Sequence, residues 1–342
     1  MKKIGFILLL FFFSVWVSKA QNLIAVENNS TPSFFTSLDS AIVHAQNGDT
    51  VYIPGGAFAV NNNTITIDKE LHLIGVGHNP DSTIATGMTK INAGAIYLVS
   101  GANSSSFEGF KLNGDLISGV NTSNEDVDNI SITRCHFMGN IDLSRFSTNW
   151  SVTESIIDGS IEGSSQSGIQ PLAQLNYFSN NIIGGGYIFF GPNNQFKNNI
   201  FLYQGYNIMN VVGCIFENNI FIGGLSNISS CTFNNNLYTG NFVIPSDCIL
   251  SNNILVLSIT AIFFNFSANT NFSYTENFHL LSTCPGKNAG RDGTDIGIYG
   301  GAFPWKEGSV PFNPHIQYQN ISGSTNTNGN LNVNIKVAAQ DH

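Results

Sequence analysis

Apolar and short polar residues recur with a regular long-range spacing in the middle of the chain. Between Phe137 and Leu250, a bulky apolar residue is followed three positions later by Asn or Ser, and then usually by Ile or Leu. The clear copies begin at Phe178, Phe196, Phe216, Phe233 and Leu250, and fainter copies begin at Phe137 and Ile157. Their polar positions, at 140, 160, 181, 199, 219, 236 and 253, lie 17 to 21 residues apart. This spacing, with strand-length apolar runs, predicts a stack of β-coils.

Each repeat is too short to bury its own apolar face, so neighbouring repeats must cover it. Parallel strands one coil apart lie about 4.8 Å from each other, and equivalent residues therefore stack in columns. We expect an internal aromatic column and a column of bends, since Asn tolerates left-handed backbone geometry and stacked amides can bond along the axis. A structural role is favoured over a binding role. The aromatic column is Phe178, Phe196, Phe216 and Phe233, and the amide column is Asn181, Asn199, Asn219, Asn236 and Asn253.

A short amphipathic segment precedes the repeats. Ser37 can cap a helix whose apolar positions Leu38, Ala41, Ile42 and Ala45 fall on one face. Such a helix would cover the open end of the coil stack, which otherwise exposes a bare sheet edge.

The repeats, together with the sequence that opens them, resemble the pectate lyase-like superfamily. Residues 48–56 read GDTVYIPGG and residues 71–75 read LHLIG, which is similar to the usual opening of that superfamily after a capping helix. The resemblance covers residues 51–301 and implies an all-β fold, a single-stranded right-handed parallel β-helix. Because the superfamily includes lyases, hydrolases, epimerases and proteins without known catalysis, it implies a fold and no particular reaction.

The two ends of the chain suggest a division into four parts. Lys2, Lys3 and the apolar run that follows, up to Ala20, have the form of a secretory signal peptide, and no other stretch resembles a membrane span. We expect a secreted or surface protein with a signal peptide (1–20), an N-terminal cap (21–50), a β-helix (51–301) and a closing segment (302–342). Residues 295–301 resemble a closing coil, and the alternation at 331–337 predicts a terminal strand, added to a sheet edge.

Charge narrows the range of partners. Removing residues 1–20 takes away three of the 13 basic residues and none of the 22 acidic ones, so the net charge is 10 − 22 = −12. Such an acidic chain disfavours nucleic acid and gives little attraction for anionic glycans unless Ca²⁺ bridges the charges. The sequence predicts a monomer whose partner, if it has one, is a polysaccharide or a cell-surface component, with no cofactor. Ca²⁺ enters only if the protein is a lyase.

Four of the five cysteines share a position relative to the repeats. Cys135, Cys214, Cys231 and Cys248 each lie two residues before a bulky repeat position, so strand alternation places them on the inward face. Stacked side chains that run parallel give poor disulfide geometry. The absence of CxxC spacing also argues against a metal site. We expect free, buried thiols.

Candidate catalytic residues are sparse. A β-helix lyase needs a Lys or Arg base and acids that neutralise charge, and the candidates are Lys111, Arg134, Arg145 and Asp142, with Lys111 and Arg134 expected to face solvent. The longest break in the repeat, residues 118–128, carries Glu125, Asp126 and Asp128 as candidate binding residues. An ordinary solvated acidic loop is the favoured interpretation. No adjacent Asp-Asp pair of the kind expected in hydrolases of this fold occurs.

Two functions remain after these observations. The first is a non-catalytic scaffold for surface interaction or carbohydrate binding, favoured because the fold signature lacks a complete catalytic constellation. The alternative is a polysaccharide lyase or another carbohydrate-active enzyme with a divergent groove. The sequence leaves the enzyme question open and leans towards no activity.

Overall fold

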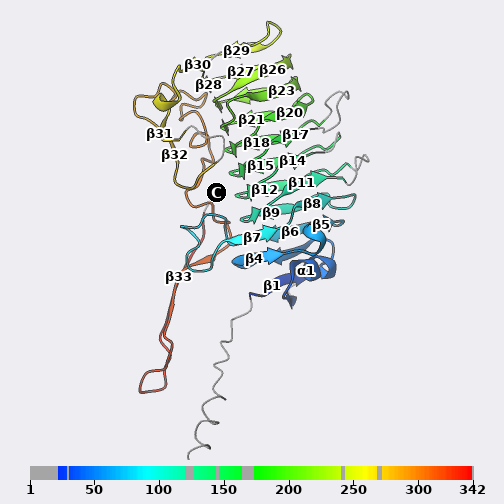
Figure 1. Ribbon diagram of the computed structural model, residues 1–342, viewed down its shortest axis with the longest axis vertical. Helices are drawn as coiled ribbons and strands as arrows, with labels where there is room; N and C mark the ends of the chain where they lie inside the picture. Colours follow the sequence, from blue (N-terminus) through cyan, green and yellow to red (C-terminus); the bar gives the residue numbers. More distant parts are fainter. Residues whose placement is uncertain are drawn as a thin grey trace, which may run out of the picture.

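The computed structural model describes residues 22–28, 31–119, 126–143, 146–163, 173–239, 243–267 and 272–340. Within them the chain forms three long sheets, here called sheets A, B and C (Figure 1). Sheet A consists of β2 (Thr31–Phe35), β1 (Ile24–Asn28), β3 (Asp49–Tyr52), β6 (Leu71–Ile74), β9 (Ser106–Glu108), β12 (Ser131–Thr133), β15 (Ser151–Thr153), β18 (Tyr177–Ser179), β21 (Gln195–Lys197), β24 (Ile215–Glu217), β27 (Thr232–Asn234) and β29 (Ile249–Ser251).

The other two sheets contain parallel strands only. Sheet B consists of β4 (Gly56–Ala59), β7 (Thr89–Asn92), β10 (Lys111–Leu112), β13 (His136–Phe137), β16 (Ile156–Ile157), β19 (Ile182–Ile183), β22 (Ile200–Phe201), β25 (Ile220–Phe221), β28 (Leu237–Tyr238) and β30 (Ile254–Leu255). Sheet C consists of β5 (Thr64–Ile67), β8 (Ala95–Leu98), β11 (Asp115–Ser118), β14 (Ile141–Asp142), β17 (Ile161–Glu162), β20 (Tyr187–Phe190), β23 (Tyr206–Val212) and β26 (Gly224–Ser229).

From β3 onward the chain visits sheets A, B and C in turn, and each strand pairs in parallel with the strand one coil away. A 3₁₀ turn, η1 (Asn61–Asn63), precedes β5. The prediction of an all-β fold built from stacked parallel strands is confirmed, and the arrangement is β-helix-like. No helix among the described residues has both the length and the apolar character needed to cross a membrane.

The aromatic column lies inside the stack as predicted. Phe178, Phe196, Phe216 and Phe233 are fully buried, and consecutive rings are stacked with centroids 5.0, 4.8 and 4.8 Å apart. The two fainter repeats were assigned to the wrong column. Phe137 and Ile157 belong to sheet B, whereas the residues in register with Phe178 in the earlier coils are Ile132 and Val152. The chain turns from sheet A to sheet B at one corner of each coil, the A-to-B corner, and from sheet B to sheet C at the next. At both corners an apolar residue precedes a small polar one, so the spacing along the sequence did not show which corner a repeat belongs to.

The amide column is also structural, but its backbone geometry differs from the prediction. Each ladder Asn donates its backbone N–H to the side-chain oxygen of the next, as from Asn199 to Asn219 at 2.9 Å. The left-handed φ values, between 52° and 58°, belong instead to the residue before each ladder position, namely Asn180, Asn198, Asn218, Asn235 and Asn252. The first Asn of each pair therefore makes the bend, and the second Asn turns inward to form the ladder.

The cysteines occupy two columns rather than one. Cys214 follows Asn194 in register, and the Asn194 amide lies 3.8 Å from the Cys214 sulfur, so this column continues a second buried amide ladder. Cys135 belongs to the Asn181 column instead, because its backbone N–H donates to Ser155 Oγ. All five thiols are free. Burial raises the pKa of Cys231 to about 11, whereas Cys248 is only partly buried, contrary to expectation.

The N-terminal end is closed as predicted. Helix α1 (Leu38–His44) starts after Ser37, whose hydroxyl accepts the backbone N–H of Ser40 at 3.1 Å. Leu38, Ala41 and Ile42 are buried against the first coils. Strands β1 and β2 add to sheet A in antiparallel fashion, and with α1 they cover this end of the core.

After β30 the chain turns back along the stack. The described parts of residues 256–312, here called the return segment, contain η2 (Ile259–Ala261), β31 (Phe263–Asn265) and β32 (Asn277–Leu280). They pack against sheet B and along the A-to-B corner. Residues 295–301 lie in the return segment and do not form a closing coil: the Gly297 N–H donates to Asn218 O at 2.8 Å. The predicted terminal strand is β34 (Val333–Ala338), which among the described strands pairs with β33 (His315–Ile321) and not with an edge of sheets A to C.

Candidate functional site

The predicted catalytic residues lie on different parts of the coil. Lys111 is in β10 of sheet B, Arg134 is at the A-to-B corner, and Asp142 is in β14 of sheet C. Arg145 and Glu125 lie outside the described residues. The structure therefore does not bring Lys111 or Arg134 together with Asp142, and the constellation that a lyase would need is not assembled from them.

Arg134 is buried and not solvent-facing, which corrects the prediction for this residue. Its side chain is 1% exposed, its Nε donates to Glu154 Oε2 at 2.9 Å, and its Nη1 donates to Val310 O at 3.0 Å. The guanidinium carbon lies 4.0 Å from the centre of the Phe312 ring. Arg134 therefore anchors the return segment to the coil and is not placed to act as a base on a substrate.

The acidic insertion also has a structural component. Asp128 Oδ1 accepts the backbone N–H of Thr148 at 2.7 Å and its hydroxyl at 3.0 Å. These bonds connect the segment just before β12 to the segment just before β15, one coil further along the stack. Asp126 is exposed and lies in the segment before β12. The contacts of Asp128 favour a role in coil stacking.

Sheet C brings Asp142 together with two acids that sequence reasoning missed. Asp142 and Glu162 are register partners in β14 and β17, which places their backbones about 4.8 Å apart. Asp115, in β11, lies close enough to act on both electrostatically. Burial, followed by the charges of Glu162 and Asp115, raises the pKa of Asp142 to about 7. Burial and Asp115 also raise the pKa of Glu162.

The hydrogen bonding of these acids leaves capacity for a ligand. Asp142 Oδ1 is shielded from solvent and has no hydrogen-bond partner within the described part of the chain. Asp115 Oδ1 accepts the Asn140 N–H at 2.7 Å, which orients that carboxyl group. No group of three or more His, Cys, Asp or Glu side chains in the described ranges is arranged to hold a metal ion. The acids are therefore a candidate for hydrogen bonding or proton transfer.

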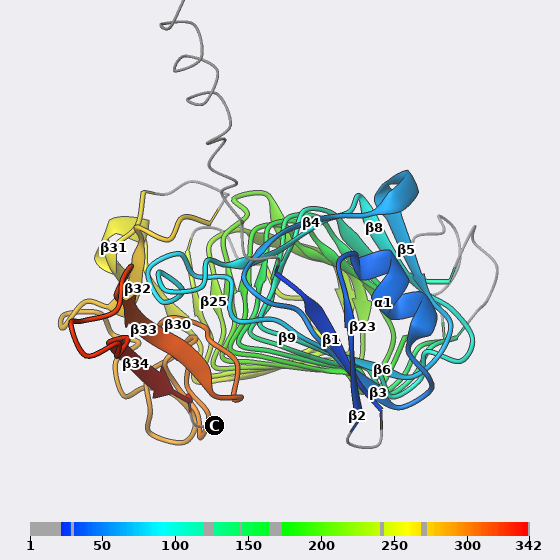
Figure 2. The same cartoon turned by 90° about the horizontal axis from the view of Figure 1, so that it is seen from below.

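The surroundings of the acids form an open face. Tyr97 in β8 and Ile117 in β11 continue the Asp142 column towards the N-terminal end. In Figure 2 the strands of the return segment lie on the side of sheet B, away from β5 and β8 of sheet C. Sheet C thus presents an aromatic ring and paired carboxyl groups on a face that the described return segment leaves uncovered.

A second cluster of titratable groups lies on sheet B, underneath the return segment. His136 Nε2 is 2.9 Å from Asp158 Oδ2, and His136 Nδ1 is 2.9 Å from Tyr274 Oη, which is also 3.0 Å from His78 Nδ1. Burial lowers the pKa of His136 and, more strongly, that of His78, and it also lowers the pKa of neighbouring Lys111. His136 and His78 are 3% and 0% exposed, so a substrate does not reach them. Through its contacts with Tyr274, the cluster holds the return segment against the coil.

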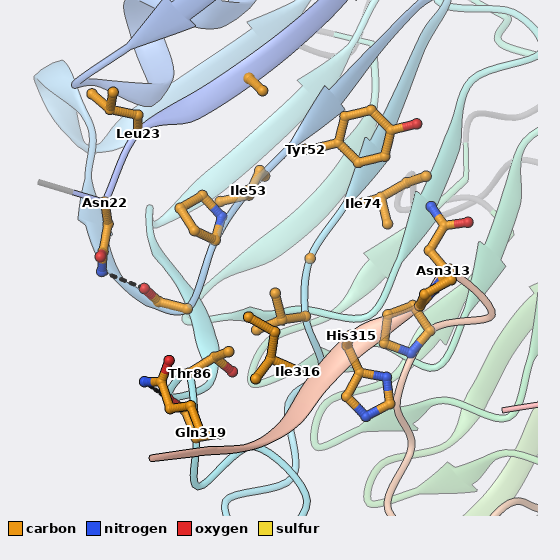
Figure 3. Close-up of a pocket in the computed structure, with 18 residues that line it drawn as sticks. Asn22, Leu23, Tyr52, Ile53, Ile74, Thr86, Asn313, His315, Ile316 and Gln319 are labelled. Atoms are coloured by element: carbon orange, nitrogen blue, oxygen red, sulfur yellow. Dashed lines mark hydrogen bonds between the residues drawn. The ribbon is translucent and has the colours of Figure 1, made fainter. Parts of the chain in front are cut away.

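A pocket of about 480 Å³ lies where the chain leaves the corner to enter β33 (Figure 3). Its walls come from the first coils, including Tyr52, Ile53 and Ile74, and from the base of β33, including His315 and Ile316. The volume suits a small ligand. Its described lining contains no Asp, Glu, Lys or Arg, and it offers apolar contact together with the titratable groups of His315 and Tyr52.

Comparison with known proteins adds no functional information: no protein-family model, curated protein or solved structure matches the chain.

Proposed function

We propose that the chain is a secreted, right-handed single-stranded β-helix of the pectate lyase-like type whose open face on sheet C binds an uncharged carbohydrate. The A-B-C strand order, the N-terminal cap and the opening motif at residues 48–56 support this fold assignment. The signal-like residues 1–20 support export.

The Asp142–Glu162 pair carries the proposal. With its pKa raised to about 7, the Asp142 carboxyl group is protonated in a large part of the molecules at neutral pH, so it can donate as well as accept a hydrogen bond. A sugar hydroxyl is also both donor and acceptor, so it matches a pair in which one carboxyl group can donate and the other can accept. Tyr97 on the same face can pack against a sugar ring.

Charge selects the class of carbohydrate. Three acids on the face and a formal net charge of −9 for the whole chain oppose an anionic polysaccharide. A neutral glycan is not repelled by these charges, and its hydroxyl groups can accept a hydrogen bond from protonated Asp142 or donate one to a carboxylate of the pair. We therefore expect neutral polysaccharides to bind more tightly than uronate polymers.

Titration calorimetry with soluble neutral and uronate polysaccharides tests this proposal. Asp142→Asn and Glu162→Gln keep the side-chain shape but change the hydrogen-bonding pattern, and each should weaken binding about tenfold or more. Asp68→Asn is a matched control, since its side chain is 66% exposed and does not belong to the sheet C cluster. Equal affinity of the Asp142 and Glu162 variants and the wild type would contradict the placement of the site, and failure to bind any polysaccharide would contradict the function.

Hydrolysis of a glycosidic bond is a second candidate, because a carboxylic acid with a pKa near 7 beside a carboxylate is the pair that such hydrolysis requires. Reducing-end release from bound neutral glycans measures it. In a hydrolase, Asp142→Asn and Glu162→Gln should abolish release, and Asp68→Asn should not. The lyase alternative is less supported, since Lys111 lies on another sheet and Arg134 is sealed in an ion pair.

A further inference from the structure

The two ends of the coil stack are finished differently. Helix α1 and strands β1 and β2 cover the N-terminal end, whereas the last strands, β29 and β30, have a neighbour on one side only. Large apolar side chains are exposed around these last strands, with Leu257 86%, Phe264 70% and Leu250 53% exposed. We call this surface the open end and define it by Ile249, Leu250, Leu255, Leu257 and Phe264.

An uncovered end is costly for a repeat protein. Each coil is stabilised by the coils on both sides, and the terminal coil therefore requires a cap. Unpaired strand edges with apolar neighbours are also sites where another chain can add. No described residue of this chain covers β29 in the way that α1 covers the first coils.

The C-terminal hairpin has the opposite deficiency, because it has a sheet face without a partner. Among the described strands, β33 and β34 pair only with each other. Ile321, Val333, Ile335 and Val337 alternate with polar residues along the strands and are each between 46% and 56% exposed. An isolated two-stranded hairpin is marginally stable in water, so packing of its apolar residues against another surface would stabilise it.

The hairpin is placed to meet the open end of another copy and not its own. Figure 1 shows the hairpin extending past the N-terminal end of the stack, at the opposite end of the long axis from β29 and β30. Viewed along that axis in Figure 2, the hairpin overlaps β30, β31 and β32. A second copy displaced along the axis would therefore bring its β30–β31 region next to the hairpin of the first.

Charge permits this contact although the protein is acidic. Two copies with a formal net charge of −9 each repel one another as a whole. However, residues 243–267 around the open end contain a single charged residue, Asp247, and residues 315–338 of the hairpin contain a single Lys, Lys336, and no acid. The two surfaces are thus nearly uncharged, and the charges they do carry are of opposite sign.

We propose that the hairpin of one copy packs on the open end of the next copy along the axis, so that the protein assembles head to tail. The contact joins two different surfaces, and repetition by displacement along the axis gives an open chain of molecules and not a closed dimer. Assembly of this kind departs from the monomer expected from the sequence. It is independent of carbohydrate binding on sheet C.

Sedimentation velocity of the mature full-length protein over about a hundredfold range of concentration tests the proposal. We expect species larger than a dimer that grow with concentration, and stronger assembly when salt screens the repulsion between acidic copies. Ile335→Asp on the hairpin and Leu257→Asp on the open end should each abolish growth. Met138→Asp, at a side chain that is 48% exposed and belongs to neither surface, is the matched control and should assemble normally.

A mixture of the Ile335→Asp and Leu257→Asp proteins distinguishes head-to-tail assembly from pairing of two hairpins or of two open ends. The Ile335→Asp protein keeps an intact open end, and the Leu257→Asp protein keeps an intact hairpin. A head-to-tail contact therefore predicts that the mixture forms one-to-one dimers and stops there. Hairpin-to-hairpin pairing predicts no such dimer in the mixture and would overturn the proposal.

Thermal unfolding monitored by circular dichroism confirms that each variant is folded before it is compared. A wild-type protein that sediments as a monomer at every concentration and salt level would overturn the proposal. The same conclusion would follow if both Asp variants assembled as well as wild type. Recovery of dimers in the mixture, together with normal growth of Met138→Asp, would establish it.

Discussion

Arg134 and Glu154 lie on the same two successive coils as Asp142 and Glu162, and the contrast between these pairs separates structure from function in this molecule. At the A-to-B corner the two charges are opposite, 2.9 Å apart and sealed by Val310 and Phe312. On sheet C the two charges are alike, and burial, followed by repulsion from neighbouring acids, raises both pKa values. Opposite charges under a cover hold a chain together, whereas like charges on an open face cost stability and are better explained by a ligand.

The largest effect should come from breaking the corner pair. Arg134→Ala leaves the Glu154 carboxylate buried without its cation and should lower the free energy of unfolding by about 3–5 kcal/mol. Urea unfolding measures the change. Arg291→Ala is the matched control, since Arg291 pairs with Glu217 at 2.6 Å but is 65% exposed, and it should cost far less than Arg134→Ala. Equal losses in the two variants would contradict the assignment of Arg134 as a buried anchor.

A slightly smaller loss is expected from the amide ladder inside the same corner. Asn219 donates to Phe196 O at 2.8 Å and to Asn236 Oδ1 at 3.0 Å, and it accepts the Asn199 N–H at 2.9 Å. Asn219→Ala leaves these buried groups unpaired and should cost about 3 kcal/mol in the same urea assay. A loss below about 1 kcal/mol would show that water or a neighbouring amide replaces the bonds.

Substitution in the sheet C pair should change the free energy of unfolding in the opposite direction, and most strongly at higher pH. Since the folded-state pKa of Asp142 is raised from 3.8 to about 7, its contribution to stability is complete below pH 3.8 and declines as pH rises through 7. Asp142→Asn should therefore stabilise the protein at pH 8.5, on the order of 2 kcal/mol after solvent screening, and by much less at pH 5. Urea unfolding at both pH values measures this difference, and a pH-independent effect would contradict the raised pKa.

The smallest change in the free energy of unfolding is expected at the first Asn of an Asn pair, the residue that makes the bend at the A-to-B corner. Asn252 is exposed and has φ of 53°, a geometry that both Asn and Gly adopt readily. Asn252→Gly should change the free energy of unfolding by less than about 0.5 kcal/mol, whereas Asn252→Ala should cost about 1 kcal/mol because of the left-handed backbone. If both variants lost as much as Asn219→Ala, the division of roles within the Asn pairs would be wrong.

Sequence reasoning succeeded where a local pattern is repeated in every coil. The Phe178 column, the Asn181 column and the capping helix after Ser37 were all predictable because each depends on spacing along the chain. It failed for Phe137 and Cys135, because two corners of the coil share a similar pattern and only strand register tells them apart. Glu162 was overlooked for the same reason, since its proximity to Asp142 depends on register and not on distance in sequence.

Stacked β-coils with internal columns of rings and amides could be predicted from the sequence, because those features follow from a repeat of 17 to 21 residues. The tertiary structure was needed to show that the described parts of residues 256–312 turn back over sheet B and that Arg134 is buried while the described return segment leaves the face around Asp142 uncovered. It was also needed to show that the described residues leave β29 and β30 without a cap. The physical reason is that burial depends on which distant segment lies over a surface. A residue's own neighbours in sequence carry little information about that segment.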